Sequence, residues 1–138
     1  MANTAVSVGT FTDAWNTRRP EAVARCYAPD GARVQMAFPP ERIEGREALA
    51  KHVGGIMAAW PDFVLDVRSE AVTTDGLTIM EWTFRGTQQA DYGPIPGNGQ
   101  EMALEGVSVI VTDGTLIREE RVYWDGVGLM AAAGMLPD

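Results

Sequence analysis

Two side chains of the right types for acid/base chemistry, Tyr123 and Asp125, stand two positions apart at the end of the segment 116–125. This segment follows a turn signal, Asp113-Gly114, and has the pattern of a strand, on which residues two apart share a face. A carboxylate in an apolar pocket can act as an acid or base, and a nearby hydroxyl can donate a hydrogen bond to a developing enolate oxygen. We therefore predict Asp125 and Tyr123 as catalytic residues. A helix N-cap remains open for Asp125, and a core position for Tyr123.

Three more polar side chains could contribute to the same site. His52 is the only histidine and lies at the edge of an expected helical stripe, where an imidazole could be a general base or a structural group. Arg121 shares the face of Tyr123 and could contact the substrate or form an ion pair. Ser108, on the neighbouring strand, is expected on the same concave side. His52 has no ligand-spaced partners, and the sequence holds no phosphate loop or dinucleotide fingerprint, so we predict neither a metal nor a cofactor.

Composition limits the partners that the protein can have. The 138 residues suit one domain, 1–138, and include 19 acidic and 11 basic residues, a formal net charge of -8. This charge argues against nucleic acid or an anionic membrane surface as the main partner. No apolar run approaches the roughly 20 residues that span a bilayer, and the first residues lack the features of a secretory signal, so a cytoplasmic protein is expected. The single cysteine, Cys26, rules out an internal disulfide.

The order of helical and strand patterns predicts an α+β fold. Apolar stripes at steps of three and four residues predict helices over 5–16, from Pro20 to about Tyr27, over 46–60 and over 127–136. Other patterns predict strands over 32–38, 63–72, 77–88, 101–112 and 116–125, with a turn at Pro29-Asp30-Gly31 and a loop over 90–99. Helices packed on one face of a curved, mostly antiparallel sheet leave a concave side that can hold a small-molecule cavity.

Large apolar residues in these elements are the expected lining of the cavity, although each could instead be a plain core residue. As a set they suit a flat polycyclic or terpenoid ligand, through burial and stacking. They are Trp15, Tyr27, Met36, Trp60, Trp82 and Phe84. On the opposite face of the strand 101–112, an apolar row of Val107, Val109 and Val111 predicts a homodimer through sheet packing.

Several short phrases span nearly the whole chain. They are Ala14-Trp15-Asn16, Tyr27-Ala28-Pro29-Asp30, Trp60-Pro61-Asp62, Phe84-Arg85-Gly86-Thr87, Pro94-x-Pro96-x-Asn98-Gly99, Asp113-Gly114 and Arg121-Val122-Tyr123-Trp124-Asp125. In this order they resemble the SnoaL-like polyketide cyclase family, within the nuclear-transport-factor-like superfamily. The resemblance implies a cone-shaped α+β barrel, with a sheet wrapped around N-terminal helices and an apolar pocket inside. It also implies an aldol-type ring closure without metal or cofactor, in which a buried carboxylate, matched to Asp125, is the acid/base on a polyketide ester. For this chain we expect a small hydrophobic carbonyl compound as the substrate.

The sequence departs from the cyclase pattern at two positions. Gln88 stands where many relatives carry a histidine, and Ser108 or Ile110 stands where the cyclases place another. Ketosteroid isomerisation is an alternative, although Phe11 and Gln35 fall at the positions of its catalytic tyrosine and aspartate. Epoxide hydrolysis is another, although the middle strand lacks its Arg-x-Asp pair. A non-catalytic module for ligand binding or dimerisation is a further alternative, because this fold hosts many functions.

Overall fold

The computed structural model describes residues 8–137, so residues 5–7 of the predicted first helix lie outside the described part. The described helices are α1 (Val8–Asn16), α2 (Pro20–Ala24), α3 (Arg46–Ala59) and α4 (Gly126–Ala132). The strands are β1 (Tyr27–Gln35), β2 (Glu41–Glu44), β3 (Val64–Val72), β4 (Thr78–Thr87), β5 (Glu101–Asp113) and β6 (Leu116–Trp124). None of these four helices is long and apolar enough to cross a membrane.

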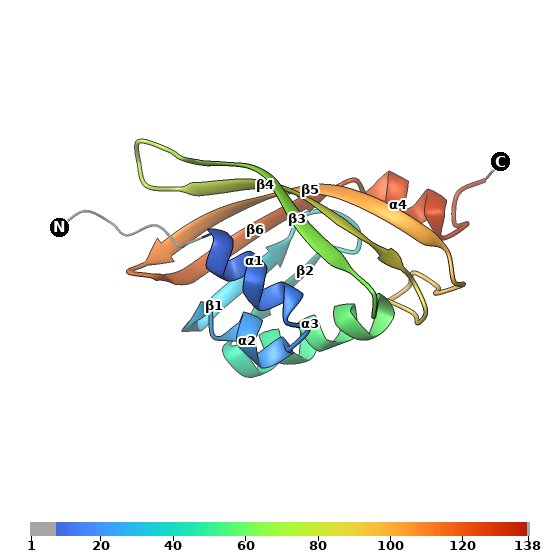
Figure 1. Ribbon diagram of the computed structural model, residues 1–138, viewed down its shortest axis with the longest axis horizontal. Helices are drawn as coiled ribbons and strands as arrows, with labels where there is room; N and C mark the ends of the chain where they lie inside the picture. Colours follow the sequence, from blue (N-terminus) through green and yellow to red (C-terminus); the bar gives the residue numbers. More distant parts are fainter. Residues whose placement is uncertain (1–7, 138) are drawn as a thin grey trace.

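The strands form one sheet in the order β2-β1-β6-β5-β4-β3. Neighbouring strands are antiparallel except β1 and β6, which run parallel. In Figure 1, α1, α2 and α3 lie together on one side of the curved sheet, and α4 follows β6 at one end. The predicted α+β class, with a curved and mostly antiparallel sheet, is confirmed. The sheet is open and not a closed barrel, because β2 and β3 are its two edges.

The first part of the sheet differs from its prediction. β1 starts at Tyr27, runs through the predicted turn at Pro29-Asp30-Gly31 and ends at Gln35, and the short strand β2 was not predicted. The pairing of β1 with β6 shifts register between Tyr27 and Ala32. A Cβ on Gly31 would lie 2.6 Å from the backbone oxygen of Ile117. Glycine therefore permits a close approach of two strands here, and does not form a turn.

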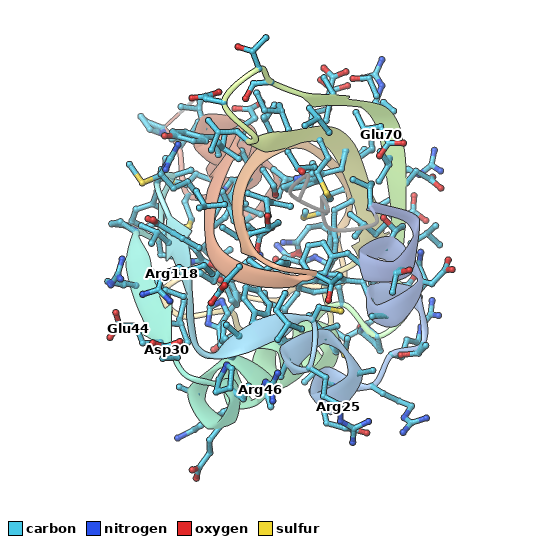
Figure 2. The ribbon with its side chains drawn as sticks, turned by 90° about the vertical axis from the view of Figure 1, so that its left-hand side faces the viewer. Arg25, Asp30, Glu44, Arg46, Glu70 and Arg118 are labelled. Atoms are coloured by element: carbon cyan, nitrogen blue, oxygen red, sulfur yellow. The ribbon has the colours of Figure 1, made fainter. Side chains whose placement is uncertain are left out.

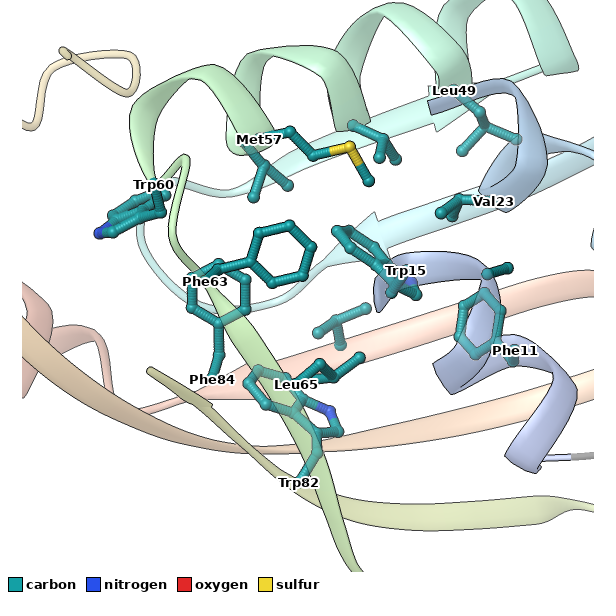
Figure 3. Packing of buried hydrophobic residues seen from close by; sticks show 14 of the residues in the cluster. Phe11, Trp15, Val23, Leu49, Met57, Trp60, Phe63, Leu65, Trp82 and Phe84 are labelled. Carbon is teal, nitrogen blue, oxygen red and sulfur yellow. The ribbon is translucent and has the colours of Figure 1, made fainter. Parts of the chain in front are cut away.

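Aromatic side chains from the helices and the sheet meet in the core (Figure 3). The rings of Phe63 and Phe84 stack with centroids 5.1 Å apart, and Trp15 of α1 meets Phe63 edge-on at 6.2 Å. Leu49 and Val53 of α3 are fully buried. The apolar stripes that predicted α1 and α3 are thus the faces that these helices bury, and each large side chain contributes roughly 1.5–3 kcal/mol by leaving water.

A bulge in β6 decides which of its side chains face inward. Val111 of β5 lies opposite Glu119 and Thr112 lies opposite Ile117, so that Arg118 is an extra residue on β6. Figure 2 shows the Arg118 side chain at the outer surface of the protein, where it is 56% exposed. One extra residue shifts the two-residue alternation of a strand by one face.

Beyond this bulge the two faces of β6 are the reverse of the prediction. Glu120 and Val122 are buried, at 2% and 0% exposed, whereas Tyr123 is 42% exposed. The prediction that Arg121, Tyr123 and Asp125 share the concave side is therefore wrong. The strand carries a carboxylate into the interior, but the carboxylate is that of Glu120.

Candidate active site

A mostly apolar pocket lies on the concave side of the sheet, with walls from α1, α3, α4 and from five of the six strands. Five of the residues predicted to line it do so: Trp15, Trp60, Trp82, Phe84 and Ser108. Its polar lining comes from Arg33, Gln35, Tyr92, Ser108 and Glu120. A few convergent polar groups in an apolar wall are the usual form of a small-molecule site.

Three other predicted lining residues lie elsewhere. Tyr27 is fully buried but does not line the pocket. Met36 is 48% exposed, because β1 turns Arg33 and Gln35 inward and the alternating residues outward. Because of the bulge in β6, Arg121 lies on the outer face of the sheet, opposite Val109. The predictions for Met36 and Arg121 are therefore wrong.

Glu120 is the centre of a buried hydrogen-bond network. Its Oε1 accepts from the Tyr27 hydroxyl at 2.5 Å and from Arg33 Nη1 at 3.0 Å, and its Oε2 accepts from Ser108 Oγ at 2.7 Å. Burial and then the negative charge of Glu120 raise the pKa of Tyr27 well above its ordinary value, so this hydroxyl remains a donor. The carboxylate is thereby fixed at the wall of the pocket by three donors from β1 and β5.

Arg33 supplies the positive charge that matches Glu120. The two side chains are 8% and 2% exposed. Burial alone would lower the pKa of Arg33, but nearby Glu120 and Tyr27 more than offset this, and the pKa is raised above its ordinary value. The guanidinium also lies over the Trp15 ring, 5.6 Å from its centroid. Arg33 and Glu120 thus place a fixed cation and a carboxylate in one apolar pocket.

Ser108 is itself held in place by Trp82. The indole Nε1 of Trp82 donates to Ser108 Oγ at 3.1 Å, which leaves the serine hydroxyl to donate to Glu120. The ring of Trp82 lies against Gly106 on the neighbouring strand, and any Cβ at that glycine would clash with it. Gly106 therefore makes room for the indole whose N–H orients Ser108.

A second polar cluster surrounds Gln35. Its Oε1 accepts from the Tyr92 hydroxyl at 3.0 Å and from Arg33 Nε at 3.4 Å, and it lies 2.8 Å from His52 Nε2. Its Nε2 donates to the backbone oxygen of Pro39 at 3.0 Å. Because the amide oxygen can only accept, His52 Nε2 carries the proton. His52 is not a lining residue, so it positions Gln35 and Tyr92 from behind the wall.

The imidazole of His52 is neutral at neutral pH. Burial, followed by the positive charge of Arg33, lowers the pKa of His52 to about 4. His52 Nδ1 lies 3.3 Å from Glu41 Oε2, but the glutamate side chain is 57% exposed. With a neutral ring this contact is not an ion pair, and the lowered pKa follows from the buried surroundings of the ring.

The pKa of His52 predicts an acid-sensitive fold. The unfolded chain has a histidine pKa of about 6.5, so on acidification the unfolded state takes up the proton first and stability falls between about pH 6.5 and 4. Between pH 7 and pH 5 the expected loss is about 2 kcal/mol. Urea denaturation at both pH values measures it. His52→Gln, which keeps an N–H donor, should remove most of this pH dependence, and an unchanged dependence would contradict the assignment.

Asp125 caps α4 and does not enter the pocket. Its Oδ1 accepts from the backbone N–H of Gly128 at 2.8 Å, and a Cβ at Gly128 would clash with the carboxylate. The helix-cap alternative is thus the one that the geometry supports. The catalytic predictions for Asp125 and Tyr123 do not fit their positions, since neither lines the pocket.

The cap at Asp125 predicts a stability effect without an effect on the pocket. Asp125→Ala should lower the free energy of unfolding by about 1 kcal/mol, because a helix N–H loses its acceptor. Asp125→Asn should cost only a fraction of this, since asparagine also caps helices. Thermal or urea denaturation of the two variants makes the comparison, and equal losses would argue against the cap.

Sequence reasoning missed four polar residues of the site: Arg33, Gln35, Tyr92 and Glu120. One available signal was the predicted loop 90–99, because loops rich in turn residues often border a pocket, and this loop contributes Tyr92 to the lining. The bulge at Arg118 had no such signal. Among residues 8–137, no group of three or more histidine, cysteine or acidic side chains is arranged to hold a metal ion.

The architecture is shared with solved structures of the ketosteroid isomerase-like cone fold. A hypothetical protein of this fold from Catenulispora acidiphila, in complex with trimethylamine, has a TM-score of 0.79 and 19% identity, covering 94% of this chain and 92% of that chain. A putative SnoaL-like polyketide cyclase from Jannaschia sp. has a TM-score of 0.78 and 18% identity, with the same coverage. The putative polyketide cyclase IdmH from Streptomyces antibioticus has a TM-score of 0.73 and 20% identity, covering 92% and 95%. At these identities the likeness shows the fold.

The sequence itself matches the family model of the SnoaL-like polyketide cyclases over residues 5–133. The chain therefore belongs to the SnoaL-like polyketide cyclase family, as its short phrases indicated. None of the curated proteins compared with it is significantly similar in sequence.

Proposed function

We propose that this protein is a cofactor-free acid/base enzyme that acts on a hydrophobic carbonyl compound, by aldol-type cyclisation or isomerisation. One observation carries the proposal: the buried pair of Arg33 and Glu120 lies in the wall of a mostly apolar pocket. The family and the cyclases among the structural neighbours support the reaction class. Glu120 takes the role that the sequence had suggested for Asp125.

Glu120 and Arg33 divide the chemistry between them. The carboxylate removes a proton from the carbon next to the substrate carbonyl, and the carbonyl oxygen becomes an enolate. Arg33 donates from Nε to Gln35 and from Nη1 to Glu120, and its guanidinium lines the pocket, so in this mechanism one of its remaining N–H groups donates to that oxygen. A fixed cation in a pocket that excludes water stabilises this developing charge strongly.

The proton balance closes without an oxidant or reductant. In an aldol cyclisation the enolate carbon attacks a second carbonyl carbon of the same molecule, a carbon–carbon bond forms, and the new alkoxide takes the proton from Glu120. In an isomerisation the proton returns to a different carbon. Tyr27 and Ser108 hold the carboxylate in place throughout, and the aromatic walls of the pocket bind the apolar body of the substrate.

Proton abstraction can be tested before the natural substrate is known. The probe is para-isopropylacetophenone, dissolved in D₂O. The protons of its acetyl methyl group exchange for deuterium when a base removes them, and proton NMR follows the loss of their signal. The wild-type protein should accelerate this exchange over buffer. No acceleration, or full acceleration in Glu120→Gln, would sink the proposal.

A non-catalytic ligand-binding module is the second candidate. It is favoured by the fact that Glu120 already accepts three internal hydrogen bonds, which satisfy its charge without a ligand. Such a module would bind the ketone, as a titration followed by NMR would show, without accelerating deuterium exchange. The same experiment therefore separates the two candidates.

We further infer a homodimer through the outer face of the sheet. Val107 of β5 lies opposite Tyr123 of β6, which is 42% exposed, and Met36 continues the same face at 48% exposed. This apolar surface needs cover in water. Light scattering at micromolar concentration should give a dimer, and Val109→Lys on the same face should give a monomer. A monomeric wild-type protein would contradict the inference.

A further inference from the structure

The indole of Trp60, a residue of the pocket wall, holds a buried hydrogen-bond donor that is unused within the described residues. Trp60 is 3% exposed and lines the pocket, yet its Nε1 has no hydrogen-bond partner among residues 8–137. The ring is fixed between Phe84, at 5.6 Å, and Tyr92, at 5.5 Å between centroids. Figure 3 shows its nitrogen on the side turned away from Phe63 and Phe84. The direction of this N–H is therefore set by packing.

In two other tryptophans of the pocket, the indole N–H has a hydrogen-bond acceptor. Trp82 Nε1 donates to Ser108 Oγ at 3.1 Å, and Trp124 Nε1 donates to the backbone oxygen of Phe38 at 3.0 Å. The other buried atoms without a partner in the described part are the hydroxyls of Thr12 and Thr78, and neither residue lines the pocket. Among these buried unpartnered atoms, only the Trp60 Nε1 belongs to a residue of the pocket wall.

Leaving a buried N–H without an acceptor destabilises a fold by roughly 1–3 kcal/mol, so native structures keep few such groups. A phenylalanine at this position would fill much of the same space at no such cost. The cost is recovered when a ligand supplies the acceptor. The donor then also rejects ligands that lack an acceptor at this point.

We propose that the Trp60 N–H donates a hydrogen bond to an oxygen of the bound ligand, and that Trp60 is a specificity-determining residue. The ligand then carries two oxygen acceptors on one apolar body, the first at Arg33 and the second at Trp60. The place of the first oxygen rests on the proposed function. The second contact rests only on the unpartnered indole, and it holds for an enzyme and for a binding module alike.

The test uses two probes of nearly the same shape. Both para-diacetylbenzene and para-isopropylacetophenone offer one acetyl group to Arg33, but only the first offers a second acceptor. In isotope-labelled wild-type protein, para-diacetylbenzene should move the indole N–H resonance of Trp60 downfield, and para-isopropylacetophenone should not. This measurement needs no variant to fold.

Dissociation constants for the two probes complete the comparison. The preference for para-diacetylbenzene, as a ratio of the two constants, should fall about fivefold in Trp60→Phe, the usual worth of one neutral hydrogen bond. Tyr123→Phe is the matched control, because Tyr123 lies outside the pocket, and its ratio should stay that of the wild type. An unmoved Trp60 resonance, or an unchanged ratio in Trp60→Phe, would overturn the proposal. Failure of deuterium exchange would instead count against the proposed function alone.

Discussion

Replacing Arg33 by methionine is expected to lower the free energy of unfolding by about 3–5 kcal/mol. The side chain of Glu120 is only 2% exposed, so the variant would leave a buried carboxylate without its counter-charge, and the loss follows from that unpaired charge. Tyr27 and Ser108 would still donate to Glu120, but neither is charged. Urea denaturation followed by circular dichroism measures the change.

Two further variants isolate the cause of this loss. Adding Glu120→Gln to Arg33→Met removes the unpaired charge and should recover a large part of the stability. Arg85→Met is the matched control, since the ion pair of Arg85 with Asp66 has side chains 58% and 51% exposed, and its loss should be far smaller. Equal losses in Arg33→Met and Arg85→Met would contradict the view that burial gives the pair its importance.

Replacing Glu120 by glutamine is expected to lower the rate of deuterium exchange into a bound ketone by about 100-fold or more. Glutamine has nearly the shape of glutamate but cannot accept a proton at neutral pH, and a positioned base contributes at least this factor. The affinity for the ketone should change much less, because the aromatic walls of the pocket remain. Proton NMR in D₂O gives the rate, and a titration gives the affinity.

Asp125→Asn is the matched control for this rate, since Asp125 is also a carboxylate at the end of the same strand. Its side chain caps α4 and lies outside the pocket, so its exchange rate should stay within about twofold of the wild type. Circular dichroism must show that Glu120→Gln is folded, and Glu120→Asp, which keeps the charge, provides a second variant. A large loss in Asp125→Asn together with a normal rate in Glu120→Gln would reverse the assignment.

Local patterns were sufficient to predict most of the framework. The stripes of α1 and α3 repeat every three to four residues because each helix buries one face, and these elements form close to the predicted positions. β4 and β5 begin and end within one residue of their predicted bounds. The inward position of Ser108 was also predicted correctly, because β5 keeps its alternation through that residue.

The site was harder to predict because β1 turns polar residues inward and β6 breaks its alternation. At the end of β1 and just after it, the apolar residues Val34 and Met36 face outward while Arg33 and Gln35 face the pocket, the opposite of what hydrophobicity alone indicates. A binding pocket needs polar groups inside, and this need competes with the core pattern. In β6 the run Arg118-Glu119-Glu120-Arg121 is charged on both faces, so that nothing in it marks the extra residue.

The bulge at Arg118 makes the length of one hairpin a determinant of the chemistry of the pocket. If the pairs next to the turn at Gly114 and the bulge keep their places, the number of residues between the turn and the pocket sets the face on which each later side chain of β6 lies. The loss or gain of a single codon upstream of Glu120 would turn this carboxylate to solvent and present its neighbour Arg121 to the cavity. A change of one residue in the length of this hairpin would thus replace the carboxylate of the pocket wall by a guanidinium, without any substitution among the residues that line the pocket.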